Sequence, residues 1–169
     1  MKDIENALGA LRLALRNTFS SHAPKIEADW TLSGRTVSET GGRLTEDFVL
    51  THLPSALDHE PFDRVSTEVP LSGRSIEDIS IELEGPKACI RLLLDVKGHN
   101  EYRKGSRPNI ASIRKCLELY GDSESESTEI VIFYCRYRPS VPPTGSGKEV
   151  VYDVLPESFG NAGVFLLRS

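Results

Sequence analysis

The chain has 169 residues and a formal net charge of −5 at pH 7, with 20 Lys and Arg against 25 Asp and Glu. This length predicts a single domain whose core is large enough to fold without disulfides or a structural metal. The acidic balance argues against a protein that coats nucleic acid indiscriminately, but it leaves room for one basic surface. The sequence has no apolar run long enough to span a membrane and its N-terminus does not resemble a signal peptide, so we expect a cytoplasmic protein.

The three cysteines, Cys89, Cys116 and Cys135, are odd in number, and no two of them stand at CxxC spacing. This pattern argues against a disulfide framework and against a zinc site. All three lie in stretches that read as strand or helix, so we predict that they are small buried hydrophobic residues.

The first part of the chain predicts two helices. Residues 3–19 carry apolar side chains at helical spacing along one face. Residues 24–42 mix Gly, Ser and Thr, and they predict a connection with little regular structure. A second helix is predicted over residues 44–53, with Thr45 as its N-cap and Pro54 marking its end.

The centre of the chain predicts an antiparallel hairpin. A short strand is predicted first, over residues 65–71. Residues 78–83 alternate polar and apolar side chains, which is typical of a half-buried strand. Residues 84–86 (EGP) are a turn signal, and the nearly continuous apolar run over residues 88–96 predicts a central strand covered on most of both faces.

The last part predicts a helix and further strands. A polar, basic segment over residues 98–108 precedes a helix predicted over residues 109–120. Residues 129–137 predict another strand, and residues 139–148, rich in Pro and Gly, predict a flexible connection. The tail after residue 149 predicts either two short strands or one strand and a loop. Together these elements indicate an α/β domain with a mixed sheet.

A carboxylate and an amine stand together at the end of the central strand. Alternation along a strand places Asp95 and Lys97 on one side and Val96 on the other. Asp78 opens the preceding strand at nearly the same distance from the turn, and a bulge or an offset would bring it level with Asp95. Because buried charges need partners or a metal, these residues are a candidate functional site.

Two carboxylates and a lysine at one place suit hydrolysis of a phosphodiester bond. Carboxylate oxygens are ligands for Mg²⁺, which lowers the pKa of a bound water and stabilises charge on a phosphate. A lysine can position or deprotonate the attacking water, or neutralise the developing negative charge. We therefore expect Asp78 and Asp95 to hold the metal and Lys97 to act on the water.

The order of Asp78 and the Asp95–Lys97 pair resembles the motif of the PD-(D/E)xK nuclease superfamily. The proline of that motif is missing before Asp78, as it is in many members. Glu46, on the second predicted helix, resembles the upstream acidic residue that several members place near the metal. Residues 98–119 are similar to the segment after the catalytic lysine in a subset of type II restriction enzymes. The resemblance covers roughly residues 40–137.

This resemblance implies a type II restriction endonuclease with one nuclease domain over residues 1–169, built on a restriction-endonuclease-like mixed β-sheet flanked by helices. The implied reaction is Mg²⁺-dependent hydrolysis of double-stranded DNA, with Mn²⁺ as a substitute and Asp78, Asp95 and Glu46 as metal ligands. We expect a homodimer, because twofold symmetry matches a palindromic site. A cognate DNA methyltransferase would be the partner in such a restriction system, and no membrane partner is expected.

Basic and polar side chains follow Lys97 closely and predict a DNA contact. Arg and Lys neutralise phosphates, and Arg also binds guanine edges. The alternative interpretation is a solvated loop and helix face. The predicted DNA-binding residues are His99, Asn100, Tyr102, Arg103, Lys104 and Arg107.

Other interpretations stay open at this point. The acidic residues and the lysine would also fit a surface salt bridge at a strand end. The same core would also suit a DNA repair or junction-resolving nuclease, or a DNA-binding module without catalytic activity. Glu77, Glu82 and Glu84 are alternative acids, and Asp63 is a weaker substitute for Asp78.

Overall fold

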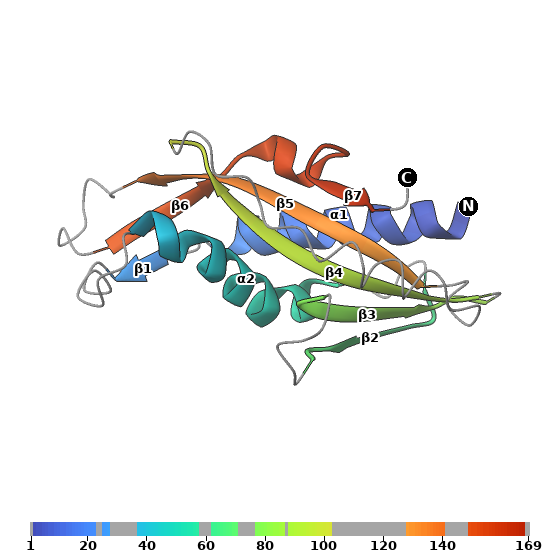
Figure 1. The fold of residues 1–169 in the computed structure, drawn as a ribbon. Helices are drawn as coiled ribbons and strands as arrows, with labels where there is room; N and C mark the ends of the chain where they lie inside the picture. The colour runs from blue at the N-terminus through green and yellow to red at the C-terminus, as the bar shows by residue number, and fades with distance from the viewer. Residues whose placement is uncertain are drawn as a thin grey trace.

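The structure is a computed structural model. It describes residues 2–22, 25–27, 37–57, 62–70, 77–86, 88–102, 128–140 and 149–167. In these ranges, two long helices lie against a seven-stranded mixed sheet (Figure 1). This arrangement confirms the predicted mixed α/β class.

The first helix is close to its prediction. Helix α1 spans Lys2–Ser21, and its apolar face buries Leu8, Leu11 and Leu15. These side chains join one hydrophobic cluster with Val49 of the second helix and the inner face of the sheet. Helical spacing of apolar side chains was therefore a sufficient signal for this element.

The second helix begins earlier and ends later than predicted. Helix α2 spans Val37–Ala56, so Thr45 is buried inside it and is not an N-cap. Pro54 also lies inside the helix, within its last turn, where the missing N–H breaks only one hydrogen bond. Packing of α2 on β4 and α1 outweighs the poor helix propensity of Gly41 and Gly42, about 1 kcal/mol each.

The prediction of little regular structure over residues 24–42 is wrong in both parts of this segment that the structure describes. Strand β1 (Lys25–Glu27) lies in it, and α2 begins within it. Strand β1 pairs antiparallel with β6 (Glu149–Val154), with Ile26 opposite Val150. A strand this short shows no periodic pattern of its own. It forms through a partner that comes from the other end of the chain.

The sheet has the order β1-β6-β5-β4-β3-β2, and β7 pairs with β5 beside this path. Strands β4 and β5 are parallel, and the other pairs are antiparallel. Figure 1 shows β4 and β5 as the longest strands, running side by side through the molecule. The remaining strands are β2 (Arg64–Glu68), β3 (Ile79–Glu84), β4 (Cys89–Asn100), β5 (Thr128–Ser140) and β7 (Val164–Leu166).

Most predicted strands are present with shifted ends. The strand predicted over residues 65–71 is β2, and the tail forms the two short strands β6 and β7. The strands predicted over residues 88–96 and 129–137 both continue further, as β4 and β5. Their parallel register runs on to Asn100 opposite Tyr137, which gives the polar end of β4 backbone partners on its β5 side. Residues 98–100 therefore belong to a strand and not to the predicted polar segment, and residues 139–140 belong to β5.

The two faces of β4 have different surroundings. Leu92, Leu94 and Val96 belong to the cluster that includes α1 and α2. Asp95 and Lys97 alternate with them and lie on the opposite face. Strand β4 therefore places Asp95 and Lys97 on the face opposite Leu92, Leu94 and Val96.

The cysteine prediction has three outcomes. Cys135 is fully buried, as predicted. Cys89 is exposed, which contradicts the prediction, because it is the first residue of β4 beside the hairpin turn. Cys116 lies outside the described residues, as does the helix predicted over residues 109–120.

Candidate active site

The β3–β4 hairpin places Asp78 beside the end of the apolar run of β4. The register pairs Glu84 with Cys89 and Ile79 with Leu94 without interruption, and the turn at residues 85–88 is closed by a 2.9 Å hydrogen bond from Gly85 N to Ala88 O. Asp78 lies just beyond this register, and its N–H bonds to the carbonyl oxygen of Leu94, the partner of Ile79. Two residues of one strand thus face one residue of the other, which is the arrangement of a β-bulge.

Two hydrogen bonds hold Asp78 against β4. Its backbone N–H donates to the carbonyl oxygen of Leu94 at 2.8 Å. Its carboxylate Oδ2 accepts from the backbone N–H of Val96 at 2.6 Å. The side chain thus takes the place of a strand carbonyl just where β3 begins, and a bond to a charged acceptor contributes about 1.5–3 kcal/mol. This contact fixes the Asp78 carboxylate beside Asp95.

Asp95 is a buried carboxylate, only 2% exposed, at the end of the apolar run of β4. Its Oδ1 accepts a hydrogen bond from Nζ of Lys97, and the two side chains form an ion pair. Its Oδ2 is buried and has no hydrogen-bond partner in the described part of the chain. An unpaired buried carboxylate oxygen is costly, and a bound cation or a proton shared with Asp78 would satisfy it.

Helix α2 brings Glu46 to the same place. Burial is the main cause that raises the pKa of Glu46 to about 6, the nearby charges of Asp78 and Asp47 raise it further, and Lys97 opposes the rise. A hydrogen-bonding contact with the Asp78 carboxyl group also contributes. Glu46 therefore lies close enough to Asp78 and Lys97 to share their electrostatic environment.

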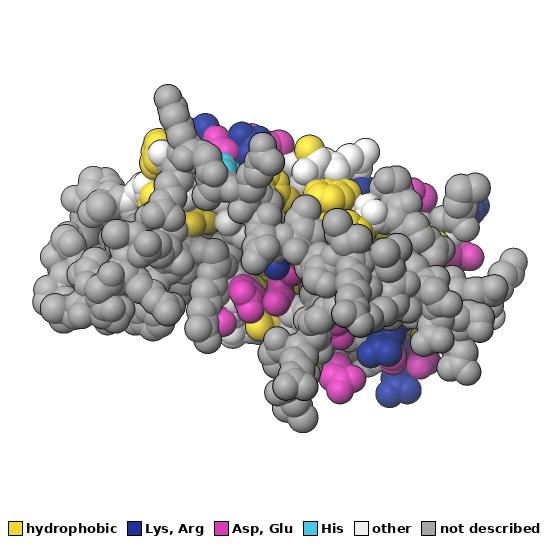
Figure 2. All heavy atoms as spheres, in the orientation of Figure 1, with side chains coloured by type: hydrophobic (Ala, Val, Ile, Leu, Met, Phe, Trp, Pro, Cys, Tyr) yellow, Lys and Arg dark blue, Asp and Glu magenta, His cyan; other side chains and the backbone are white. Residues whose placement is uncertain are grey.

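Asp95 interacts electrostatically with two of the same residues, Lys97 and Asp78. Burial raises the pKa of Asp95 above its ordinary value, Lys97 lowers it, and contact with the Asp78 carboxyl group raises it again. Figure 2 shows acidic side chains grouped beside a basic one over α2 and the start of β3. Carboxylates that face one another need a shared proton or a cation, and one ammonium group cannot balance three of them.

The donor set fits a hard divalent cation such as Mg²⁺, which prefers carboxylate oxygens and retains several waters. The supporting observation is the unpaired Oδ2 of Asp95 next to Asp78. Within the described ranges, however, no three acidic, histidine or cysteine side chains form a ready-made set of metal ligands. Asp78, Asp95 and Glu46 are thus brought together without forming a complete coordination shell.

The predicted DNA-binding residues divide into three groups. His99 lies on β4, on the same face as Lys97, and its ring stacks on Tyr134 with centroids 5.6 Å apart. Asn100 is buried and its Oδ1 accepts from the backbone N–H of Tyr102 at 3.0 Å, so it orders the turn after β4. Tyr102 is 70% exposed. Arg103, Lys104 and Arg107 lie outside the described residues.

The alternative acids do not join the site. Glu82 and Glu84 are exposed on β3 towards the turn, where they lie 4.0 Å from Arg91 and 3.9 Å from Arg64. Asp63 is also exposed and lies before β2, next to the turn end of the hairpin, where its N–H donates to Glu84 O at 2.7 Å. Glu77 directly precedes Asp78 and is half-buried.

Sequence reasoning did not identify the residues of β5 that line the site. Strand β5 runs parallel to β4 with Lys97 opposite Tyr134 and His99 opposite Arg136. Arg136 pairs with Glu101 at 2.7 Å and with Glu157 at 3.2 Å. The signal that could have revealed them is the appearance of Tyr134 and Arg136 at alternate positions directly after the apolar run Ile130–Phe133 of this strand.

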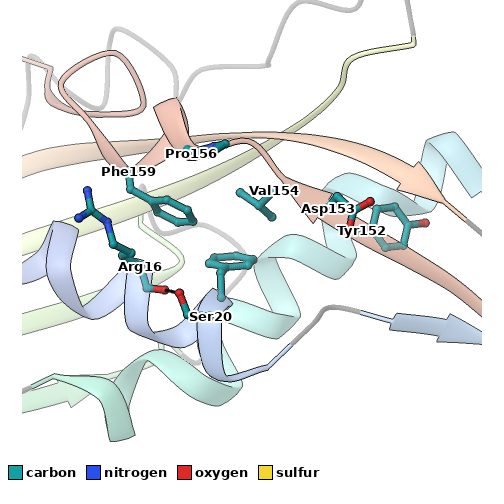
Figure 3. Close-up of a pocket in the computed structure, with 8 residues that line it drawn as sticks. Arg16, Ser20, Tyr152, Asp153, Val154, Pro156 and Phe159 are labelled. Atoms are coloured by element: carbon teal, nitrogen blue, oxygen red, sulfur yellow. Dashed lines mark hydrogen bonds between the residues drawn. The ribbon is translucent and has the colours of Figure 1, made fainter. Parts of the chain in front are cut away.

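A separate groove of about 410 Å³ lies between α1 and the segment that contains β6. Figure 3 shows Arg16 and Ser20 on the α1 side, and Tyr152, Asp153 and Phe159 on the other. None of the carboxylates described above lines it. The groove is therefore distinct from the candidate active site.

A scan against models of known protein families finds no match for this chain. A search of characterised proteins finds no significant relative. Among the helices that the structure describes, none is both long and apolar enough to cross a membrane.

Proposed function

We propose that this chain is a Mg²⁺-dependent DNA endonuclease of the type II restriction kind, with a restriction-endonuclease-like fold. The proposal depends above all on one observation. The Asp78 carboxyl group contacts that of Asp95 at the end of a central hairpin, Lys97 is bonded to Asp95, and within the described residues the buried Oδ2 of Asp95 has no hydrogen-bond partner. A salt bridge at a strand end would not require a second, half-buried carboxylate beside the first.

Each residue has a distinct proposed role. Asp78 and Asp95 would hold the metal, and Glu46 would support it or its water. The metal would supply an activated water and charge stabilisation at the phosphate. The Nζ atom of Lys97, fixed by Asp95 Oδ1, would orient the water or take up its proton. Mn²⁺ would substitute for Mg²⁺, because both accept carboxylate and water ligands.

The partners follow from the same proposal. His99 and Tyr102 would contact DNA close to the cut, and the basic residues Arg103, Lys104 and Arg107 would bind phosphates further along. A homodimer would allow both strands to be cut at a palindromic site. A DNA methyltransferase would protect the host's own sites, and the protein would act in the cytoplasm.

The experiment is a cleavage assay on plasmid, phage and branched DNA with Mg²⁺, Mn²⁺ or EDTA. Discrete fragments with either metal, and none with EDTA, would support a site-specific endonuclease. A preference for branched DNA would instead favour a junction-resolving enzyme. Binding without cleavage under all conditions would favour a non-catalytic module and overturn the proposal.

A matched pair of variants shows whether the activity belongs to this site. Asp95→Asn removes the buried charge while keeping the shape of the side chain. Glu82→Gln makes the same chemical change on the neighbouring strand, at an exposed position away from the carboxylates. We expect Asp95→Asn to abolish cleavage and Glu82→Gln to leave it unchanged.

A further inference from the structure

A row of side chains continues from Lys97 along the same face of the sheet. Lys97 and His99 alternate along β4, and Tyr134 stands beside Lys97 on the parallel strand β5. The rings of His99 and Tyr134 lie 5.6 Å apart at an angle of 29°. Two positions along a strand span about 6.6 Å, which is on the scale of the spacing between successive phosphates in a nucleic acid strand.

The position of Tyr134 is fixed on both sides. Its backbone N–H donates to Gly163 O at 2.6 Å. Gly163 packs so closely on Ser158 that an added Cβ would lie 2.0 Å from the Ser158 carbonyl oxygen. The preceding residue, Phe133, is buried on the opposite face, where its ring packs with Phe19 and Phe159. The backbone of Tyr134 therefore has little freedom, and its ring stacks on that of His99.

Tyr134 and His99 are polar neighbours of Lys97 on this face of the sheet. Arg136 is held by two carboxylates, those of Glu101 and Glu157, so much of its charge is already balanced. Burial is the main cause that raises the pKa of Tyr134, so its hydroxyl group stays protonated and can donate a hydrogen bond. Both rings are only partly buried, which leaves part of each accessible.

We propose that Tyr134 is a substrate-positioning residue that orients His99 and donates its hydroxyl hydrogen bond to the phosphate next to the one that is cut. This proposal rests on the nuclease function argued above and adds a residue of β5 to it. Ring stacking holds the imidazole, and the hydroxyl group contacts the DNA backbone. Neither group takes part in the bond-breaking step.

The test is steady-state cleavage of an oligonucleotide duplex that carries the mapped cut site, with Mg²⁺. Tyr134→Phe keeps the ring and its stacking but loses the hydroxyl group, so KM should rise about tenfold while kcat stays within about twofold. Tyr134→Leu also loses the stacking, so it should raise KM further. The double variant Tyr134→Leu with His99→Gln should raise KM by about as much as Tyr134→Leu alone. Glu82→Gln should change neither constant.

The outcomes separate this inference from the proposed function. If the wild-type protein cuts DNA and Tyr134→Phe has an unchanged KM, or a lower kcat alone, the positioning role is wrong and the nuclease function stands. If the wild-type protein cuts no DNA with any metal, the proposed function fails and this inference fails with it. Thermal unfolding of each variant shows whether it is folded, and Tyr134→Phe alone decides the question if Tyr134→Leu does not fold.

Discussion

The carboxylate of Asp78 accepts a hydrogen bond from the backbone N–H of Val96 at 2.6 Å. This bond joins the start of β3 to the residue of β4 that separates Asp95 from Lys97. It therefore links the stability of the hairpin to the geometry of the proposed site. Substitutions at this site can test the stability of the hairpin and the function of the carboxylates separately.

Asp78→Ala should destabilise the protein by about 1–2 kcal/mol, because the N–H of Val96 loses its acceptor. Asp78→Asn keeps an oxygen acceptor and removes one of the facing charges, so its free energy of unfolding should equal or exceed that of the wild type. Urea unfolding at pH 7 measures both changes. Equal stability of the Ala variant and the wild type would show that the bond contributes nothing.

Glu46→Gln should stabilise the metal-free protein at high pH only. The folded-state pKa of Glu46 is raised from 4.5 to about 6. A raised carboxyl pKa means that the folded state binds the proton more tightly than the unfolded state, so the stabilisation is present below pH 4.5 and is lost as the pH rises through 6. Glutamine cannot ionise, so the variant should exceed the wild type by about 1 kcal/mol at pH 8.

The measurement for Glu46→Gln is denaturant unfolding in EDTA at several pH values between 4 and 8. The stability difference between variant and wild type should be smallest at pH 4 and should grow between pH 4.5 and 6. Asp47→Asn, one residue along α2 at an exposed position, is the control and should show a smaller change. A difference that is constant with pH would mean that Glu46 ionises normally.

Mg²⁺ should raise the melting temperature of the wild-type protein. A divalent ion relieves the repulsion between facing carboxylates, and an ion at ten times its Kd stabilises the folded state by about 1.4 kcal/mol. For a chain of this size that corresponds to a shift of about 3–6 °C. Differential scanning fluorimetry should show this shift for Glu82→Gln and no shift for Asp95→Asn. The same shift in both variants would place the ion elsewhere.

The two cysteines that the structure describes should react at very different rates. Cys89 is exposed at the start of β4, whereas Cys135 is fully buried and burial raises its pKa strongly. A thiol reagent followed by peptide mapping should modify Cys89 in the folded protein and Cys135 only after unfolding. Rapid labelling of Cys135 in the folded protein would contradict the packing of β5.

The elements with strong local patterns were predictable from the sequence. Helix α1 and the β3–β4 hairpin follow from apolar spacing and a turn signal, and Asp95 and Lys97 follow from alternation on β4. The placement of Asp78 beside Asp95 was predicted through a bulge or an offset. The structure has such an irregularity, because the N–H of Asp78 bonds to Leu94 O although Leu94 is the register partner of Ile79.

The remaining features depend on contacts between distant segments. Strand β1 exists through its pairing with β6, and the polar end of β4 remains extended because β5 continues beside it. Tyr134 could not be placed near Lys97 until the parallel register of these two strands was known. The register between two distant strands leaves no periodic signal in the sequence of either strand.

The proposed active site is tested most directly by the single-turnover cleavage rate, with Mg²⁺, of a DNA that the wild type cuts. We expect Asp78→Asn, Asp95→Asn and Lys97→Gln each to reduce the rate by at least about a hundredfold, with Glu82→Gln at the wild-type rate. Cleavage by Asp95→Asn at the wild-type rate, in a protein shown to be folded, would contradict the proposed active site.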